Sequence, residues 1–514
     1  MEPLKQYTRN YFKTYFWKLI GYVASFASLI VVTPHLSTSP AIFGIFTFCI
    51  SLNIFFQYAD LGFLNAAQKY ASEYYGRGDL EGEIKVTGFC CLILLIIFVP
   101  ICLGTLWLSQ HPGTVIKGIS SSAGEMAIAS RLLFLLFVFS PVMIFQRIIQ
   151  MIFTVRVEGY QTQRINIIVA ILRVASIFYF FTGGRYEIVA YFLFFNCLGL
   201  VSLAVTMEIA WRRFHYNFWK LLKHARFSRG AYQATSRLAY NSLFLATVGL
   251  LFYELDLVFI GYFVDNMAVA YYALGFTLLT FFRDGYNTFF TPFMVRMNHL
   301  LGQGNEKGVM NLYDTLFRLG IPVVLIPVIS IFFLVRPLIL SWVGPMYEPS
   351  ILVAHILMVS LIFEFVTYPT RTLMLVKEKL MPLYLTGAWL VVVFITGVLL
   401  TQHVWGMKSY AIFKVVALIG SAAIFYWITL RTLQLSIIKF VRAYFVPVIV
   451  PVLAVVLLGF VAAGWLQPSK GAFYLVAVGA SWGGIVLVGF GLCYLLIPDF
   501  RSIFKTTLAG LIGK

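Results

Sequence analysis

Residues 86–108 read VTGFCCLILLIIFVPICLGTLWL and contain no Asp, Glu, Lys or Arg. A run of this length can cross the hydrocarbon core of a bilayer, which takes about 20 apolar residues in a helix. Inside that core each backbone N–H and C=O must be satisfied within the protein, and a helix does so within one segment. A membrane-spanning β-barrel would instead show alternating segments of about ten residues. The stretch therefore predicts a transmembrane helix.

The composition of the whole chain also indicates a membrane protein. Of its 514 residues 61% are hydrophobic and 11% are charged, and the mean hydropathy is +0.88. A soluble domain carries about 25% charged residues. The six cysteines show no metal-ligand spacing and are interpreted as small hydrophobic residues. The basic N-terminus and its apolar run lack a small-x-small cleavage pattern, which favours an uncleaved first span over a signal peptide.

Apolar runs of this kind recur along the chain and predict an all-α integral membrane fold with fourteen transmembrane helices. We expect six spans in a first set, six in a second set, and two more before the C-terminus. The predicted spans are 16–33, 41–62, 86–108, 126–152, 165–182, 188–210, 236–263, 268–294, 318–340, 350–374, 383–402, 409–430, 444–466 and 472–497.

The basic residues predict how the chain is oriented in the membrane. Of 38 Lys and Arg, 29 lie in or beside the N-terminus, the C-terminus and the six loops on the same side, and seven lie on the other side. Cytoplasmic loops carry such an excess of Lys and Arg, so we expect both termini in the cytoplasm. Orientation also accounts for the net charge of +18 without nucleic acid as a partner.

The longest predicted cytoplasmic connection is 211–235, where aromatic and basic residues interleave as in a helix that lies in the membrane interface. It separates an N-terminal six-helix lobe, 1–210, from a C-terminal six-helix lobe, 236–430. Residues 431–514 would then form two additional transmembrane helices and a cytoplasmic tail. Two such lobes around a central cavity are the architecture of a carrier that alternates access.

The two predicted lobes share a sequence pattern. Asp60, near the inner end of the second span, is followed by the turn GRGDLEG at 76–82, and Asp284 is followed by GQGNEKG at 302–308. We interpret Asp60 as a helix cap and the glycine-rich segments as tight turns. The copies lie six spans apart, which predicts a parallel repeat. Chance similarity of short turns is the alternative.

Three stretches resemble the multidrug/oligosaccharidyl-lipid/polysaccharide (MOP) exporter superfamily, and specifically its Wzx-type oligosaccharide (O-antigen/polysaccharide) flippases. They are YADLGF through YYGRGD at 58–79, ELDLVFIGYFV at 254–264 with AVAYYA at 268–273, and the segment 284–308. The family often has a basic residue directly after the aspartate of the second stretch, whereas Leu257 follows Asp256 here. A role for a charge at that position is therefore not carried over.

The resemblance implies a V-shaped, two-lobed fold in a bacterial-type inner membrane. It implies a flippase that moves an undecaprenyl-diphosphate-linked oligosaccharide from the cytoplasmic to the outer leaflet, for the synthesis of cell-surface polysaccharide. The lipid-linked oligosaccharide and the bilayer would be its partners, with a polysaccharide polymerase and glycosyltransferases nearby. The sequence shows no nucleotide-binding Gly-x-x-x-x-Gly-Lys-[Ser/Thr] loop, and we expect no cofactor.

Basic residues inside or near the ends of spans are candidates for binding an anionic headgroup, because arginine grips phosphate oxygens with a planar fork. Arg173 and Arg283 are predicted to line an inward-facing cavity, or alternatively to pair with a carboxylate of a neighbouring helix. Arg131 and Lys414, near the outer ends of their spans, could receive the headgroup there. Together with Arg147, near an inner end, they could instead extend to the interface.

Four acidic residues are candidates for binding a coupling ion or for gating. Glu254 and Asp256 lie two positions apart, about 200° around a continuous helix, so both could not face a cavity. A hydrogen bond at a helix end is the alternative for them. Glu364 stands alone in an apolar run, where a protonation switch and a buried ion pair are both reasonable. Asp284 adjoins Arg283.

Two other functions compete with the flippase. A cation-coupled exporter of drugs or other small molecules has the same fold but would need an acidic cavity. A membrane-embedded glycan polymerase or glycosyltransferase would need a sizeable outer loop with catalytic carboxylates. The longest predicted outer loop, 109–125, has a single acidic residue, Glu125. We therefore do not expect an enzyme.

Overall fold

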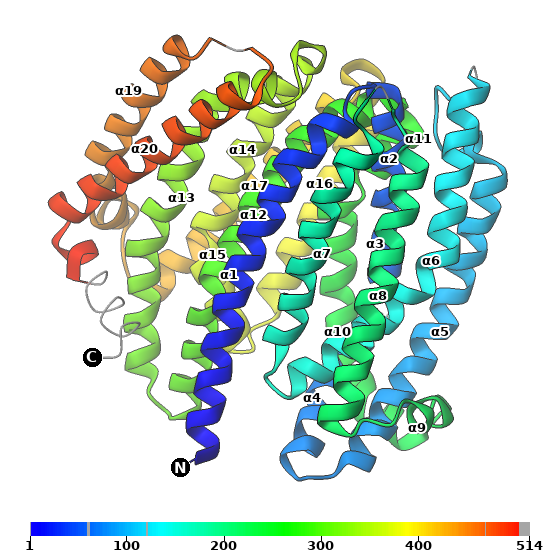
Figure 1. Ribbon diagram of the computed structural model, residues 1–514. Coiled ribbons are helices and arrows are strands. Elements are labelled where there is room, and N and C mark those ends of the chain that lie inside the picture. Colours follow the sequence, from blue (N-terminus) through cyan, green and yellow to red (C-terminus); the bar gives the residue numbers. More distant parts are fainter. Residues whose placement is uncertain (1, 59–61, 120–121, 184, 468, 503–514) are drawn as a thin grey trace. The chain divides into compact units, whose positions relative to one another are not determined.

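The computed structural model describes residues 2–58, 62–119, 122–183, 185–467 and 469–502. Within these ranges the chain is helical and has no β-strand, which confirms the predicted all-α fold (Figure 1). Each of the fourteen predicted spans is helical over most of its described residues. The chain divides into two compact units, 1–270 and 271–514.

The first unit holds the helices of predicted spans 1–7. They are α1 (Glu2–Leu36), α2 (Pro40–Ser51), α3 (Asn53–Gln57), α4 (Phe63–Gly76), α5 (Leu80–Gln110), α6 (Ala123–Val155), α7 (Gly159–Phe180), α8 (Ile188–Phe214), α9 (Phe218–Lys223), α10 (Arg229–Gly249) and α11 (Asp256–Phe263). Helix α6 lies at the centre of this unit, since α2, α5 and α8 all pack on it, while α1 packs on α7.

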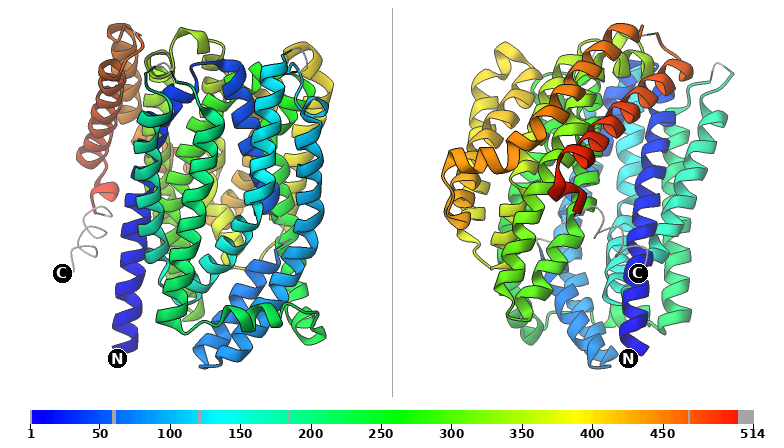
Figure 2. Two further views of the ribbon diagram at one scale, coloured as in Figure 1. Left: turned by 45° about the vertical axis from the view of Figure 1, so that its right-hand side comes forward. Right: turned by 90° about the vertical axis from the view of Figure 1, so that its left-hand side faces the viewer.

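The second unit holds spans 8–14. Its helices are α12 (Asn266–Gly302, whose first residues belong to the first unit), α13 (Glu306–Trp342), α14 (Ser350–Val366), α15 (Tyr368–Val376), α16 (Met381–Trp405), α17 (Lys408–Leu433), α18 (Ile437–Phe440), α19 (Ile449–Trp465) and α20 (Ala472–Leu496). Helix α13 is central here, because α14, α19 and α20 pack on it. Figure 2 shows α19 and α20 side by side, as their contacts require.

Ten helices among the described residues are long and apolar enough to cross a membrane, or up to twelve if each of two bent pairs is one span. Two segments complete the predicted fourteen. One is Pro40–Phe56, which is shorter, and the other is α12, which carries Arg283 and Asp284 in its middle. Exposed side chains on α19 and α20, such as Leu457 and Leu487, are apolar, as a surface in contact with lipid requires.

Helix α2 closely approaches both α11 and Asn266, the first residue of α12, and a glycine lies at each of these contacts. A Cβ atom on Gly44 would lie 1.9 Å from the carbonyl oxygen of Asn266, and one on Gly261 would lie 2.4 Å from the ring of Phe48. The loop before α6 braces the same region, since the backbone N–H of Lys117 donates to the carbonyl of Gly261 at 3.0 Å. The second stretch of the family resemblance, which contains Gly261, therefore has a packing role.

The glycine-rich turn between α4 and α5 has the same backbone conformation as the turn between α12 and α13. In the first turn Gly78 has φ +73° and the N-cap Asp79 accepts a hydrogen bond from the N–H of Gly82 at 2.8 Å. In the second turn Gly304 has φ +71° and Asn305 accepts from the N–H of Gly308, also at 2.8 Å. The tight turns predicted at 76–82 and 302–308 are confirmed, whereas Asp60 lies outside the described residues.

Further turns repeat in the same order, although their sequences do not. After α6 the N–H of Glu158 donates to the carbonyl of Phe153 at 2.9 Å, and after α15 Lys379 donates to Met374 at 2.8 Å. A non-glycine residue with positive φ completes each of these turns and each of the turns after α8 and α17: Val157 (φ 55°), Glu378 (φ 54°), His215 (φ 51°) and Gln434 (φ 54°). The parallel repeat therefore extends well beyond the glycine-rich turns.

The connection 211–235 is not the single interfacial helix that its composition predicts. Helix α8 continues to Phe214, the short helix α9 follows, and α10 begins at Arg229. Tyr216 and Leu221 are buried in the first unit, and a Cβ on Gly88 of α5 would lie 2.7 Å from the carbonyl oxygen of His224. The connection is therefore docked on α5 over part of its length, while Trp219 stays exposed.

Candidate functional site

Arg173 is half-buried on α7 and faces α8. Its Nε donates to the hydroxyl of Tyr191 at 3.0 Å, and its guanidinium lies 4.5 Å from the ring centroid of Phe195. Among the described residues no carboxylate lies within ion-pair distance of it, and the carboxylate partner considered from the sequence stays an untested alternative. Since α7 ends at Phe180, Arg173 lies about 10 Å from the C-terminal end of the helix, and not at its centre.

Lys414 is only 1% exposed, two turns into α17. Its Nζ lies 5.4 Å from the ring centroid of Phe276 on α12 and 5.6 Å from that of Phe394 on α16. An ammonium group within about 6 Å of an aromatic face is attracted to the ring's quadrupole. The expectation that Lys414 extends to the interface is therefore wrong, because the packing of three helices keeps it inside the second unit.

Arg131, eight residues into α6, is exposed and lines a pocket of about 770 Å³ between α5, α6 and the start of α8. Arg147 is half-buried further along α6. In the second unit, Arg283 is half-buried at the middle of α12, and the neighbouring Asp284 is exposed. The five basic candidates are thus divided between the units, with Arg173, Arg131 and Arg147 in the first.

The continuous helix assumed for Glu254 and Asp256 is broken. Residues Leu250–Glu254 form a turn of π-helix, α11 starts at Asp256, and the two segments meet at an angle of 53°. Asp256 is fully buried in the first turn of α11, where a carboxylate interacts favourably with the helix dipole. Glu254 is half-buried. The estimate of 200° between them does not apply, because it presumed a regular helix.

Glu364 is 7% exposed and lies three residues before the break between α14 and α15, which bends by 42°. Aromatic rings pack around this break: the centroids of Tyr368 and Phe290 lie 4.7 Å apart, and those of Phe365 and Tyr286 lie 4.8 Å apart. The described residues include no ion pair or side-chain hydrogen bond of Glu364. The protonation switch and the buried ion pair considered for Glu364 from the sequence both stay predictions.

A buried ion pair that the sequence did not reveal joins α5 to the end of α6. The guanidinium of Arg156 donates to both carboxylate oxygens of Glu83, at 2.8 and 2.9 Å, and the side chains are 4% and 1% exposed. The rings of Phe214 and Tyr216 lie 4.9 and 5.5 Å from the guanidinium. Burial raises the pKa of Tyr216. Glu83 and Arg156 are seventy-three residues apart in the sequence. Both lie in predicted loops, whose basic residues were used only to predict the orientation of the chain in the membrane.

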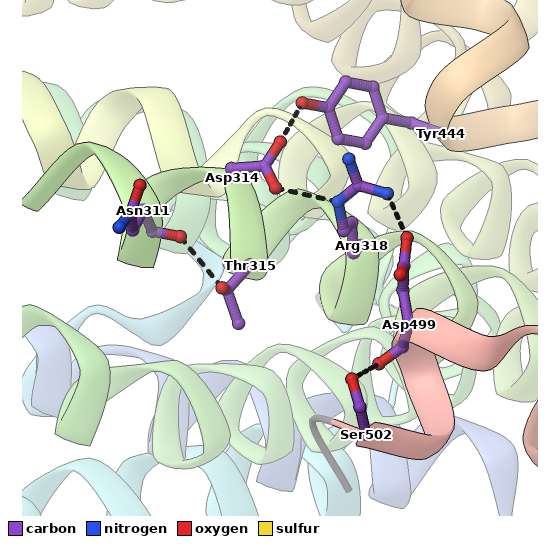
Figure 3. A network of polar contacts seen from close by, with 7 residues as sticks. All are labelled: Asn311, Asp314, Thr315, Arg318, Tyr444, Asp499 and Ser502. Carbon is purple, nitrogen blue, oxygen red and sulfur yellow. Dashed lines mark hydrogen bonds and ion pairs between the residues drawn. The ribbon is translucent and has the colours of Figure 1, made fainter. Parts of the chain in front are cut away.

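A polar network attaches the last two spans to α13 (Figure 3). Arg318 bridges Asp314, at 2.7 Å, and Asp499, and the hydroxyl of Tyr444 donates to Asp314. Asp499 follows α20 and Tyr444 precedes α19. In Figure 3 the guanidinium lies between the two carboxylates, next to the tyrosine ring. The C-terminal pair of helices is therefore fastened to the second unit by ionic contacts as well as apolar ones.

Comparison with protein-family models and with the curated proteins gives no match. Several solved structures do match. The lipid II flippase MurJ in an inward closed conformation is 12% identical, with a TM-score of 0.68 over 96% of this chain and 99% of MurJ. An inward-facing multidrug resistance MATE transporter of the MOP superfamily is 14% identical, with a TM-score of 0.62 over 80% of this chain and 94% of its own.

A MOP superfamily transporter from Pyrococcus furiosus is also similar, with 14% identity and a TM-score of 0.56 over 84% of this chain and 96% of its own. All three structures are transporters or flippases, and two of them are described as members of the MOP superfamily. The chain has their fold, which confirms the many-helix membrane fold predicted from the sequence. It is a multi-pass membrane protein.

Proposed function

We propose that the chain is a flippase for an undecaprenyl-diphosphate-linked oligosaccharide. It would move this glycolipid by alternating access from the cytoplasmic to the outer leaflet, in the synthesis of cell-surface polysaccharide. The proposal includes an inner-membrane location with both termini in the cytoplasm, as the distribution of Lys and Arg predicts. A polymerase and glycosyltransferases are proposed as partners from the resemblance alone.

The observation that carries this proposal is the environment of the Arg173 guanidinium. A charged side chain inside a transmembrane helix is costly, by up to about 2.5–3.5 kcal/mol at the helix centre on insertion scales. Arg173 meets only a hydroxyl and an aromatic ring, so its positive charge is not neutralised within the described structure. A diphosphate offers the paired anionic oxygens that a guanidinium binds best. The MurJ-like fold supports a lipid-linked cargo.

The remaining candidates keep secondary roles in the proposal. Arg283, at the middle of α12, is the proposed second contact for the diphosphate, and Lys414, Arg131 and Arg147 are proposed further contacts along the path. Asp256, Glu254, Glu364 and Asp284 are proposed for ion coupling or gating. Glu364 fits a gating role because it lies beside the bend between α14 and α15.

The membrane potential provides a driving force for such a cargo. With the cytoplasm negative, outward movement of each negative charge gains about 2.3 kcal/mol per 100 mV. A diphosphate carries more than one such charge, so its transfer can proceed without nucleotide hydrolysis. The proposal therefore predicts that a potential, negative on the side of the donor leaflet, accelerates transfer.

The test is leaflet transfer of a fluorescent undecaprenyl-diphosphate oligosaccharide in proteoliposomes that contain the full chain. We expect transfer by the wild type and its loss in Arg173→Gln and Arg283→Gln. Arg164→Gln is the matched control, because Arg164 lies on the same helix but is exposed and stacked 4.5 Å from Trp17. Arg173→Lys keeps the charge and removes the fork, so it should retain only part of the activity.

Each outcome of this test bears on a different part of the proposal. Transfer that survives both substitutions would refute the assignment of Arg173 and Arg283 and leave the flippase activity standing. No transfer of any lipid-linked glycan by folded protein would refute the flippase. The alternative is then a cation-coupled exporter of small molecules, which the MATE-like fold and the buried carboxylates Asp256 and Glu364 favour.

A further inference from the structure

The pocket beside Arg131 lies where α5 ends and where α6 and α8 begin, at one end of the first unit. Its volume of about 770 Å³ is within the usual range of ligand pockets, about 300–1,000 Å³. One part of the lining is apolar, with Leu106, Phe134 and Leu193. Phe134 and Leu193 are also 49% and 42% exposed, so the pocket continues into an apolar surface.

Two opposite charges line this pocket from different helices. Arg131 projects from α6, and Glu187 is the N-cap residue of α8. Glu187 does not cap its own helix through its side chain. Over the described part of the chain, neither of these side chains takes part in a hydrogen bond or an ion pair, with each other or with other residues. Both charges are therefore available to a ligand.

The surroundings of the two charges are fixed by the fold. The hydroxyl of Ser130 donates to the carbonyl of Ser109 at 2.6 Å, which joins α6 to α5 at the wall of the pocket. The hydroxyl of Tyr186 donates to the carbonyl of Leu36 at 2.6 Å, which holds the residue before Glu187 against α1. The pocket is thus formed without a ligand.

We propose that this pocket binds the headgroup of a zwitterionic phospholipid that carries a primary ammonium, such as phosphatidylethanolamine. The phosphate contacts the guanidinium of Arg131, the ammonium contacts the carboxylate of Glu187, and the acyl chains lie along Phe134 and Leu193. The lipid bound here would be a bilayer component and not the glycolipid that the protein is proposed to move, although both proposals use Arg131. The pocket would hold this lipid at the flank of the first unit.

The pairing of charges selects this class of lipid. An anionic headgroup without an ammonium would bring its phosphate close to the Glu187 carboxylate, and like charges repel. A choline headgroup has no N–H to donate to the carboxylate. The apolar surface next to the charges favours a molecule with acyl chains over a free zwitterion in solution.

The test measures lipid binding to the purified full-length protein by native mass spectrometry. Phosphatidylethanolamine, phosphatidylglycerol and phosphatidylcholine with identical acyl chains are titrated against the wild type, Arg131→Gln and Glu187→Gln. Arg185→Gln is the matched control, because Arg185 is an exposed arginine two residues from Glu187 that does not line the pocket. All three side chains are exposed, so elution from size exclusion should show folded protein in each case.

We expect the wild type to bind phosphatidylethanolamine more tightly than the other two lipids. Each pocket substitution should weaken that binding about tenfold, as the loss of one charge-assisted hydrogen bond implies, and Arg185→Gln should not change it. Glu187→Gln should also raise the affinity for phosphatidylglycerol. Equal binding of phosphatidylethanolamine to wild type and both pocket variants would overturn the site, and a wild-type preference for phosphatidylglycerol would overturn the zwitterionic class.

Discussion

Replacing Glu83 by glutamine should destabilise the first unit far more than its position near the end of a membrane helix suggests. The carboxylate accepts two hydrogen bonds from Arg156, at 2.8 and 2.9 Å, in a site where both side chains are less than 5% exposed. Removing one partner of such a pair leaves a buried charge uncompensated, at a cost of about 3–5 kcal/mol. The glutamine oxygen can still accept one of the two hydrogen bonds. We therefore expect a loss of about 3 kcal/mol.

The assay is reversible unfolding in mixed detergent micelles, followed by tryptophan fluorescence. Glu81→Gln is the matched control, because Glu81 lies two residues away and pairs with Lys85 at the exposed surface, so its substitution should leave the free energy of unfolding nearly unchanged. The double variant Glu83→Gln, Arg156→Met removes both charges. It should recover most of the loss, since replacing a whole buried pair is often close to neutral.

Two results would refute this reasoning. A loss below about 1 kcal/mol in Glu83→Gln would mean that Arg156 is adequately solvated or held by its aromatic neighbours without the carboxylate. A double variant less stable than either single variant would mean that the ion pair stabilises the fold by itself, contrary to the usual balance between desolvation and attraction.

Four further substitutions test the fold. Asp79→Ala and Asn305→Ala remove the N-caps of α5 and α13 and should each cost about 1 kcal/mol, with additive effects in the same unfolding assay. Gly44→Ala places a Cβ 1.9 Å from a backbone carbonyl oxygen and should lower the yield of folded protein in size exclusion, whereas Gly479→Ala, with open space around it, should not. Arg318→Gln should cost less than about 1 kcal/mol, because its ion pairs are partly exposed, yet it should speed proteolysis after α20.

The sequence predicted the helices because most of the predicted spans are long apolar runs, and a helix needs about 20 apolar residues to cross the bilayer. It also located the two glycine-rich turns, since positive φ favours glycine. The break between α10 and α11 had no such signal. Gly249 precedes it, but a single glycine does not specify a π-helix, and the direction of α11 follows from its packing against α2.

The candidate site was harder to predict, because burial of a charge depends on residues distant in sequence. The position of Lys414 near a predicted helix end indicates that it can reach the interface. In the structure the rings of Phe276 and Phe394 enclose its ammonium group. These two residues lie 138 and 20 positions before Lys414 in the sequence. Arg156 and Glu83 were assigned to loops, where a charge is normally solvated. Arg173 could be chosen from the sequence, whereas its partner Tyr191 could not, because the helix pairing was unknown.

The repeated turns have a practical consequence for how the chain can be altered. Residues 76–82 and 302–308 differ at four of seven positions and follow the same backbone path, with matching φ values and N-cap hydrogen bonds. The intervening residues of both are exposed, apart from the half-buried Leu80. The two segments are therefore interchangeable parts, and either could be transplanted into the place of the other without disturbing the helices that it joins.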